Sequence, residues 1–332
     1  MYEEFYQLSG KPFQLSPDSR FFFNSSSHNR AMAYLRYGLS QGEGFIVITG
    51  GIGTGKTMLV ANLFEEIAEE SLVAAQIVST QIGEEDVLRM VNAAFGLAHE
   101  GLSKAALLRN LEAFFRASRA EGKRVLLVVD EAQNLPRRSI EELRMLSNYQ
   151  QDGKALLQSF LIGQAELRST LQGSGMEQVR QRIIAGYHLR PLDRLEMQAY
   201  IEHRLRLVGW NEHPKFEEAA YDRLYGVTGG IPRRVNNVVD RVLLYAALEE
   251  LDLVGAPHVE TVFAEMNEEF GHKQSPLAAD DESLVEMQLD GLLTRVEALE
   301  RSFATFKELM QNDRDALRKA RAILMDLGEV NE

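Results

Sequence analysis

One stretch limits what this chain can fold into more than any other, and it reads Gly50-Gly51-Ile52-Gly53-Thr54-Gly55-Lys56-Thr57. It fits the phosphate-binding pattern GxxxxGK followed by Ser or Thr at every fixed position. Residues 45–49 before it are apolar and β-branched, which predicts a strand, and residues 58–70 after it carry apolar side chains at helical spacing. A strand, a loop and a helix in this order predict a nucleotide site. The alternative is a glycine-rich turn before an ordinary helix.

Each residue type in this loop has a chemical reason. Glycine lets the backbone turn its amides toward one point and lets phosphate oxygens approach closely. Lys56 supplies a mobile positive charge for the β- and γ-phosphates of ATP, and Thr57 supplies a hydroxyl for Mg²⁺. The helix N-terminus behind them favours an anion. The predicted nucleotide-binding residues of the loop are Gly50, Gly51, Ile52, Gly53, Thr54, Gly55, Lys56, Thr57 and Met58.

Polar residues also follow two later apolar strands. Asp130 and Glu131 come directly after the run 125–129, and the carboxyl end of a buried strand is where ligands collect in open α/β sheets. We expect Asp130 to hold Mg²⁺, directly or through water, and Glu131 to polarise the water that attacks the γ-phosphate. A polar strand exit or a first helical turn is the alternative. Gln164 follows the run 155–162, and either senses the γ-phosphate or attacking water or hydrogen-bonds a loop.

The order of elements predicts the fold class. Strands alternate with helices over residues 41–192, which indicates an α/β fold in which a parallel sheet lies between two helical layers. Residues 1–40 are rich in aromatic side chains, and we expect them to pack on this ATPase core or, as an alternative, to wall the adenine pocket. Further strands are expected at 72–79, 125–129 and 155–162, and further helices at 84–95, 103–119 and 139–150.

A small helical lid is expected at 193–271, with Arg233 at the start of its third helix, where a guanidinium can reach a phosphate bidentately. Residues 272–283 have linker composition. Residues 284–332 are expected to form one long helix, because apolar side chains spaced three and four apart give a heptad seam. This helix self-associates as a coiled coil or docks onto the ATPase body. The lid helices are predicted at 195–208, 216–227, 232–250 and 257–270.

Composition excludes several classes of protein. The chain has 332 residues and no cysteine, so disulfides and thiolate metal sites are excluded. No histidines are paired at ligand spacing, so we expect no metal beyond Mg²⁺. No signal peptide and no apolar run of the roughly 20 residues needed to cross a membrane is visible. A net charge of -13 argues against broad charge-driven nucleic-acid binding, although a local basic patch stays an alternative.

These motifs, in this order, resemble the AAA+ ATPases over roughly residues 1–270. The resemblance implies that Lys56 and Thr57 belong to Walker A and that Asp130 and Glu131 form Walker B. It further implies that Gln164 acts as sensor 1 and Arg233 as the sensor 2 arginine. Gln164 departs from the Asn or Thr that is common at sensor 1 in that family.

Longer strings are similar to the ATPases of the general secretion pathway protein A type, and specifically to the subgroup encoded with exosortase A (PEP-CTERM) and exopolysaccharide loci. They are "YEEFYQLSGKPFQLSPDSRFFF", "AMAYLRYGLSQGEGFIVITG", "LIGQAEL" and "QRIIAGYHLRPL". The resemblance implies that Arg182, or else Arg180, is a finger inserted into a neighbouring subunit's site; a surface arginine is the alternative. The membrane span and peptidoglycan-binding region of that type are not found in this sequence, so we expect an envelope role to run through partners.

Three functions follow as hypotheses. The first is an oligomeric, Mg²⁺-dependent ATPase that drives or gates an envelope export or polysaccharide-assembly system from the cytoplasm, at the inner face of the cell membrane where partners place it. The second is a DNA-associated ATPase of the transposition-target or initiator kind, with Arg233-Arg234 and Arg137-Arg138 as basic residues. The third is a nucleotide-held scaffold with little turnover, against which the intact Walker residues argue.

Overall fold

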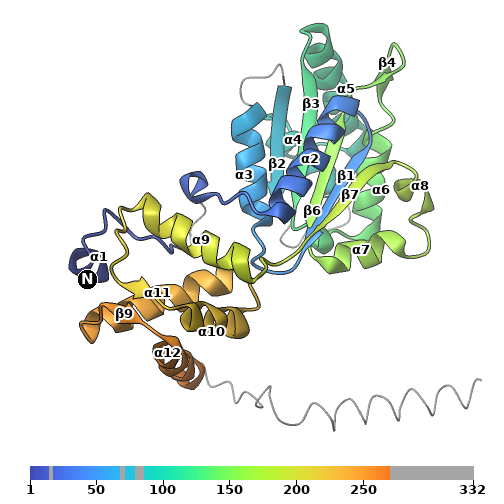
Figure 1. The fold of residues 1–332 in the computed structure, drawn as a ribbon. Helices are drawn as coiled ribbons and strands as arrows, with labels where there is room; N and C mark the ends of the chain where they lie inside the picture. The colour runs from blue at the N-terminus through green and yellow to red at the C-terminus, as the bar shows by residue number, and fades with distance from the viewer. Residues whose placement is uncertain (15–17, 68–71, 79–85, 270–332) are drawn as a thin grey trace, which may run out of the picture. The chain divides into compact units, whose positions relative to one another are not determined.

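The computed structural model describes residues 1–14, 18–67, 72–78 and 86–269 (Figure 1). The residues up to Met266 form one compact unit. The predicted linker 272–283 and the predicted helix 284–332 lie outside the described residues. Within the described ranges, no helix is both long and apolar enough to cross a membrane.

A five-stranded, all-parallel sheet forms the centre of the fold, in the order β2-β3-β6-β1-β7 (Figure 1). Parallel strands place their carboxyl ends at the same edge, so the residues that follow β1, β3 and β6 meet there. The three inner strands are buried almost throughout, which explains their continuous apolar sequences. The strands are β1 (Phe45–Gly50), β2 (Leu72–Val78), β3 (Arg124–Asp130), β6 (Gln158–Gly163) and β7 (Ile183–Leu189).

Helices cover both faces of this sheet, so the predicted three-layer α/β fold is confirmed. Ile46 and Ile48 of β1 pack against helices α2 and α3 on one face, whereas Val47 between them packs into the core on the other face. The helices are α2 (Ser26–Gln41) and α3 (Lys56–Ile67) on the first side, and α4 (Val87–Ala94), α5 (Lys104–Ala120), α6 (Arg137–Leu146), α7 (Ala165–Gln172) and α8 (Glu177–Arg180) on the second.

A helical region follows the sheet. It consists of α9 (Arg194–Leu207), α10 (Glu218–Thr228), α11 (Pro232–Leu248) and α12 (Ala256–Glu269). A capping box between Asp193 and Glu196 begins α9, and Pro232 occupies the first turn of α11. The predicted all-helical lid also contains a small parallel strand pair, β8 (Lys215–Phe216) with β9 (Leu253–Val254).

The N-terminal segment differs from the prediction that residues 1–40 pack on the ATPase core. Helix α2 packs on the sheet, and Phe22 ahead of it packs against the same core. The buried aromatic side chains ahead of it belong to the core of the helical region, where they fill space between α9, α11 and their neighbours. They come from α1 (Tyr2–Phe5), the 3-10 helix η1 (Ser19–Phe21) and the segment between them, and are Tyr2, Tyr6, Phe13 and Phe21.

Two predicted boundaries near residue 150 were also wrong. The helix expected at 139–150 ends at Leu146, and the strand expected from 155 begins at Gln158. Between them β4 (Gln150–Gln151) pairs antiparallel with β5 (Lys154–Ala155). The turn is Asp152-Gly153, with φ of 54° and 72°, and two positive φ values are what a tight hairpin turn requires. Strand β7 was not predicted at all.

Candidate nucleotide-binding site

The glycine-rich loop connects the end of β1 at Gly50 to the start of α3 at Lys56. Two of its glycines have positive φ, +79° at Gly53 and +93° at Gly55, a backbone conformation that other residues adopt only with strain. Space is short as well, because a Cβ at Gly55 would lie 2.7 Å from Nε2 of His28. The loop conformation therefore needs glycine for two reasons.

Lys56 lies within this loop and is only 6% exposed. Its ammonium donates to the carbonyl oxygens of Gly50 and Gly51, at 3.0 and 2.9 Å. Burial lowers its pKa, whereas the carboxylates of Glu131 and Asp130 act in the opposite direction. A buried ammonium at a glycine-rich loop fits a phosphate group, because the negative charge of the phosphate would offset the cost of burying the positive charge of the lysine.

Thr57 and Asp130 place two oxygen ligands side by side. Thr57 Oγ1 lies 3.3 Å from Asp130 Oδ2, and the other carboxylate oxygen accepts from the Glu131 backbone N–H at 2.8 Å. Burial is the main cause that raises the pKa of Asp130, with the nearby Glu131 charge adding to it. A hydroxyl beside a buried carboxylate is the hard oxygen set that Mg²⁺ prefers, so these two residues fit that ion.

Glu131 follows Asp130 in a left-handed conformation, with φ of 52°. Its side chain is half-buried and lines the same cavity as Lys56, Thr57 and Gln164. Glu131 Oε2 accepts from Nε2 of Gln133 at 2.6 Å and from Nε2 of Gln164 at 3.4 Å. The structure therefore brings the predicted Walker residues and the strand-end glutamine together. Gln133 is a residue that the sequence analysis missed.

Arg233 of the helical region also reaches the loop. Its backbone N–H donates to the Gly53 carbonyl at 3.2 Å, and its exposed side chain lines the same cavity. A Cβ added at Gly53 would lie 2.6 Å from the Arg233 Cβ, so this contact too depends on glycine. The start of α11 thus contacts the phosphate loop directly.

The two arginines proposed as fingers lie elsewhere. Arg182 precedes β7, which pairs with β1 from Phe45 onward, so it lies at the edge of the sheet opposite the phosphate loop. Its Nη2 donates to Asn148 Oδ1 at 2.7 Å. Arg180 donates to the carbonyl oxygens of Leu171 and Gly173, at 2.7 and 3.0 Å, at the end of α7. Within one chain neither guanidinium is part of the cavity at the loop.

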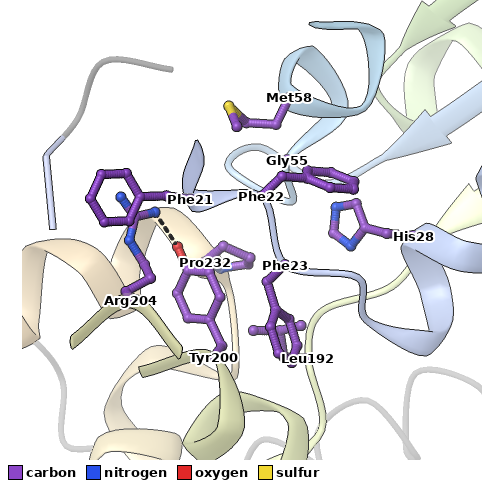
Figure 2. Close-up of a pocket in the computed structure, with 10 residues that line it drawn as sticks. All are labelled: Phe21, Phe22, Phe23, His28, Gly55, Met58, Leu192, Tyr200, Arg204 and Pro232. Atoms are coloured by element: carbon purple, nitrogen blue, oxygen red, sulfur yellow. Dashed lines mark hydrogen bonds between the residues drawn. The ribbon is translucent and has the colours of Figure 1, made fainter. Parts of the chain in front are cut away.

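An apolar cavity adjoins the phosphate loop (Figure 2). Phe21, Phe22 and Phe23 from the N-terminal segment line it, together with Leu192 and Pro232. The cavity lined by Lys56, Thr57 and Glu131 is the polar cavity. The apolar cavity adjoins it, because the two share Gly55, Met58, Tyr200, Arg204 and Pro232. The run Phe21-Phe22-Phe23 was the sequence signal for this wall. The sequence analysis gave a role in walling the adenine pocket only as an alternative to core packing.

The apolar cavity has a buried polar edge. Arg204, only 7% exposed, donates to the Pro12 carbonyl at 2.6 Å and to the Tyr200 hydroxyl at 2.8 Å, and lies over the Phe21 ring at 4.6 Å (Figure 2). Opposite, His28 bonds Ser25 Oγ through Nδ1 at 2.7 Å, and burial lowers its pKa. A site with an aromatic wall, a few polar groups and an adjoining anion cradle has the form of a nucleoside phosphate pocket.

The parallel sheet and the glycine-rich loop after β1 define a P-loop NTPase fold, and residues 39–171 match the family described as AAA domain. The chain is 39% identical over 247 residues to general secretion pathway protein A of Aeromonas hydrophila. That match covers 74% of this chain and 45% of that protein, so the chain spans about half the length of this relative. The predicted similarity to the general secretion pathway protein A type is confirmed over these 247 residues.

Solved structures agree on the fold. The ORC2 protein of Aeropyrum pernix, in ADPNP-ADP complexes, has a TM-score of 0.56 at 19% identity, covering 75% of this chain and 72% of that chain. Cdc6p of Pyrobaculum aerophilum has a TM-score of 0.59 at 15% identity, covering 75% and 71% respectively. At these identities the similarity shows a shared architecture.

Proposed function

We propose that the chain is a Mg²⁺-dependent ATPase that converts ATP and water to ADP and phosphate. The observation that carries the proposal is the placement of the Thr57 hydroxyl 3.3 Å from the Asp130 carboxylate, with Glu131 lining the same cavity. The loop is sufficient for nucleotide binding. The adjacent pair of strand-end carboxylates adds a metal ligand and a base, which hydrolysis requires.

Each residue has a distinct role in this proposal. The loop amides and Lys56 hold the β- and γ-phosphates, and Thr57 with Asp130 holds Mg²⁺. When bound, Mg²⁺ neutralises charge that develops on the phosphate oxygens. Glu131 accepts a proton from the attacking water, and Gln164 orients that water or the γ-phosphate.

The base and sugar of the nucleotide occupy the apolar cavity beside the loop. The phenylalanine wall supplies stacking surface for adenine, while Tyr200 and Arg204 lie at the junction with the phosphate cavity. Arg233 reports the nucleotide state to the helical region, because its own helix already contacts the loop at Gly53.

A second copy of the chain completes the site through Arg182. This arginine lies too far along the sheet to serve its own loop, so it would act in a neighbouring subunit, with Arg180 as the alternative. Arginine fingers in related phosphoryl-transfer enzymes are worth about 10³ to 10⁵ in rate. We therefore expect the isolated chain to turn ATP over slowly.

We infer that ATP binding and hydrolysis power or gate an envelope export or exopolysaccharide-associated, exosortase-type system, through protein partners at the inner face of the cell membrane. The support is the similarity to general secretion pathway protein A over 247 residues, together with the longer strings described above. Affinity capture with an ATP-locked variant would name the partner.

The test is the Glu131→Gln variant. We expect it to bind Mg-ATP as the wild type does and to lose about 10²- to 10⁴-fold in turnover, the usual contribution of a general base. Glu112→Gln, the same change in a half-buried Glu112–Arg116 ion pair on α5, is the matched control. Unchanged turnover in Glu131→Gln would show that the assignment is wrong.

The same assay separates the other functions. A wild type that binds ATP but does not turn it over, with or without partners, would favour the nucleotide-held scaffold. Strong, salt-sensitive stimulation by duplex DNA at low ionic strength would favour a DNA-associated ATPase.

A further inference from the structure

The side chain of Gln133 is fixed at both ends. Its Nε2 donates to Glu131 Oε2 at 2.6 Å, and its Oε1 accepts from the Gln164 backbone N–H at 2.9 Å. A carboxylate only accepts and a backbone N–H only donates, so these partners also determine which way the amide points. We propose that Gln133 is the positioning residue that holds Glu131 in its catalytic orientation, an inference that rests on the ATPase function proposed above.

The backbone turn after β3 brings Gln133 back under Glu131. Glu131 adopts a left-handed conformation that costs about 1–3 kcal/mol for a residue other than glycine. The short 3-10 helix η2 (Ala132–Asn134) follows, and the Asn134 N–H donates to the Glu131 carbonyl at 3.0 Å. This turn places an amide two residues further along the chain beside the carboxylate.

Gly163 provides independent support. Its φ is not in the left-handed region, so its backbone conformation does not require glycine. Space is short, because a Cβ at this position would lie 2.7 Å from Gln133 Oε1, 3.1 Å from Leu167 Cδ2 and 3.2 Å from the Gln133 backbone nitrogen, so Gln133 makes the tightest of these contacts. Glycine at the end of β6 therefore leaves room for the Gln133 side-chain amide.

The arrangement leaves one carboxylate oxygen available. Both amide donors reach Glu131 Oε2, and no hydrogen bond to Oε1 is found among the described residues. Oε1 can therefore accept a proton from water while Oε2 stays anchored. Gln133 itself is not among the residues that line the cavity, so it acts through Glu131 and does not touch the substrate.

The test compares Gln133→Met, which keeps the side-chain length and removes the amide, with wild type. We expect the dissociation constant for Mg-ATP to be unchanged and kcat to fall about 10- to 100-fold, as when a reacting group is misplaced by about an ångström. Gln172→Met, on the exposed end of α7, is the control and should leave both unchanged.

A second variant probes the same contact from the other side. Gly163→Ala pushes against the Gln133 amide, so it should also lower kcat. If both changes act through one contact, the Gly163→Ala and Gln133→Met double variant should lose no more than the worse single variant. Fully additive losses would overturn the proposal, as would an unchanged or increased kcat in Gln133→Met.

A binding measurement, which does not depend on turnover, separates a positioning role of Gln133 from failure of the proposed ATPase function. ADP with Mg²⁺ and aluminium fluoride imitates the transferring phosphoryl group, and we expect Gln133→Met to weaken this complex while ADP alone binds as in the wild type. Equal affinity of both proteins for the complex would overturn the positioning role. If the wild type binds the complex no more tightly than ADP and shows no turnover, the ATPase function itself fails, and the proposal falls with it.

Discussion

At the scale of single residues, the site contains two charged groups whose burial is unfavourable when no ligand is bound. Burial raises the pKa of Asp130 and lowers the pKa of Lys56, so each group is pushed toward its neutral form. Asp130 is only 3% exposed. A bound nucleotide with its metal would offset both effects, since it brings negative charge to the lysine and positive charge to the aspartate.

Asp130→Asn should therefore stabilise the protein without ligand while it damages function. Well below the ordinary pKa of 3.8, the carboxyl group is protonated in folded and unfolded chains alike and has no effect on stability. As the pH rises through the raised pKa of the folded state, the wild type loses stability that the variant keeps. At neutral pH we expect a higher Tm for Asp130→Asn, and Mg²⁺-dependent ATP binding weaker by roughly 10- to 100-fold.

Thermal unfolding between pH 4 and 8, with and without Mg-ATP, measures both effects. Asp252→Asn is the control, because that side chain is 87% exposed. A lower Tm for Asp130→Asn across this range would contradict the interpretation that its charge is costly.

At the scale of elements, the N-terminal segment is a structural part of the helical region. Tyr6 is almost fully buried, packs edge-to-face on Phe5 and His213, and donates from its hydroxyl to the Leu251 carbonyl at 3.0 Å. Tyr6→Ala should cost about 3–5 kcal/mol of stability, as for other large aromatic truncations in a core. Tyr6→Phe, which leaves that carbonyl without its donor, should cost about 1–3 kcal/mol.

Urea unfolding of both variants checks these values. Tyr37→Ala, on the exposed side of α2, should change the free energy of unfolding by less than about 0.5 kcal/mol. A stability loss from Tyr6→Ala no larger than that of Tyr37→Ala would show that the segment is not part of this core.

At the scale of the whole molecule, the proposed finger makes activity a property of more than one chain. Arg182→Ala should lose about 10³-fold or more in turnover and keep its ATP affinity. Mixed with Glu131→Gln, it should regain activity, because one subunit then supplies the base and the other supplies the finger. A mixture no more active than its components would contradict a shared site.

Arg180→Ala distinguishes the two arginines. Its guanidinium bonds the carbonyl oxygens at the end of α7, so this variant should lose stability, whereas Arg182→Ala should lose mainly turnover.

Prediction from the sequence succeeded where a pattern is local. The phosphate loop, the buried strand before Asp130 and the helices around the sheet follow from spacing and composition within a dozen residues. Strand β7 was missed because Gly186 and His188 interrupt an edge strand that is only half-buried. The hairpin at Asp152-Gly153 had a recognisable turn signal that was passed over.

The site was harder to predict where it depends on contacts between distant segments. Nothing near Phe21 in the sequence indicates Arg204, although the guanidinium lies over that ring. Gln133 was missed for a different reason. An amide near an Asp-Glu pair at a strand end looks like any polar turn residue until its two partners are seen in space.

The placement of the N-terminal aromatics has a consequence for how the chain is made. The Tyr2 hydroxyl donates to Asp240, 238 residues later, and Tyr6 bonds a carbonyl 245 residues later. Contacts of such long sequence separation form late, because the intervening chain must first be available and ordered. During synthesis Tyr2 and Tyr6 therefore wait for partners that are among the last residues of this unit to be made. The apolar cavity beside the phosphate loop cannot be complete until Pro232, at the start of α11, has emerged.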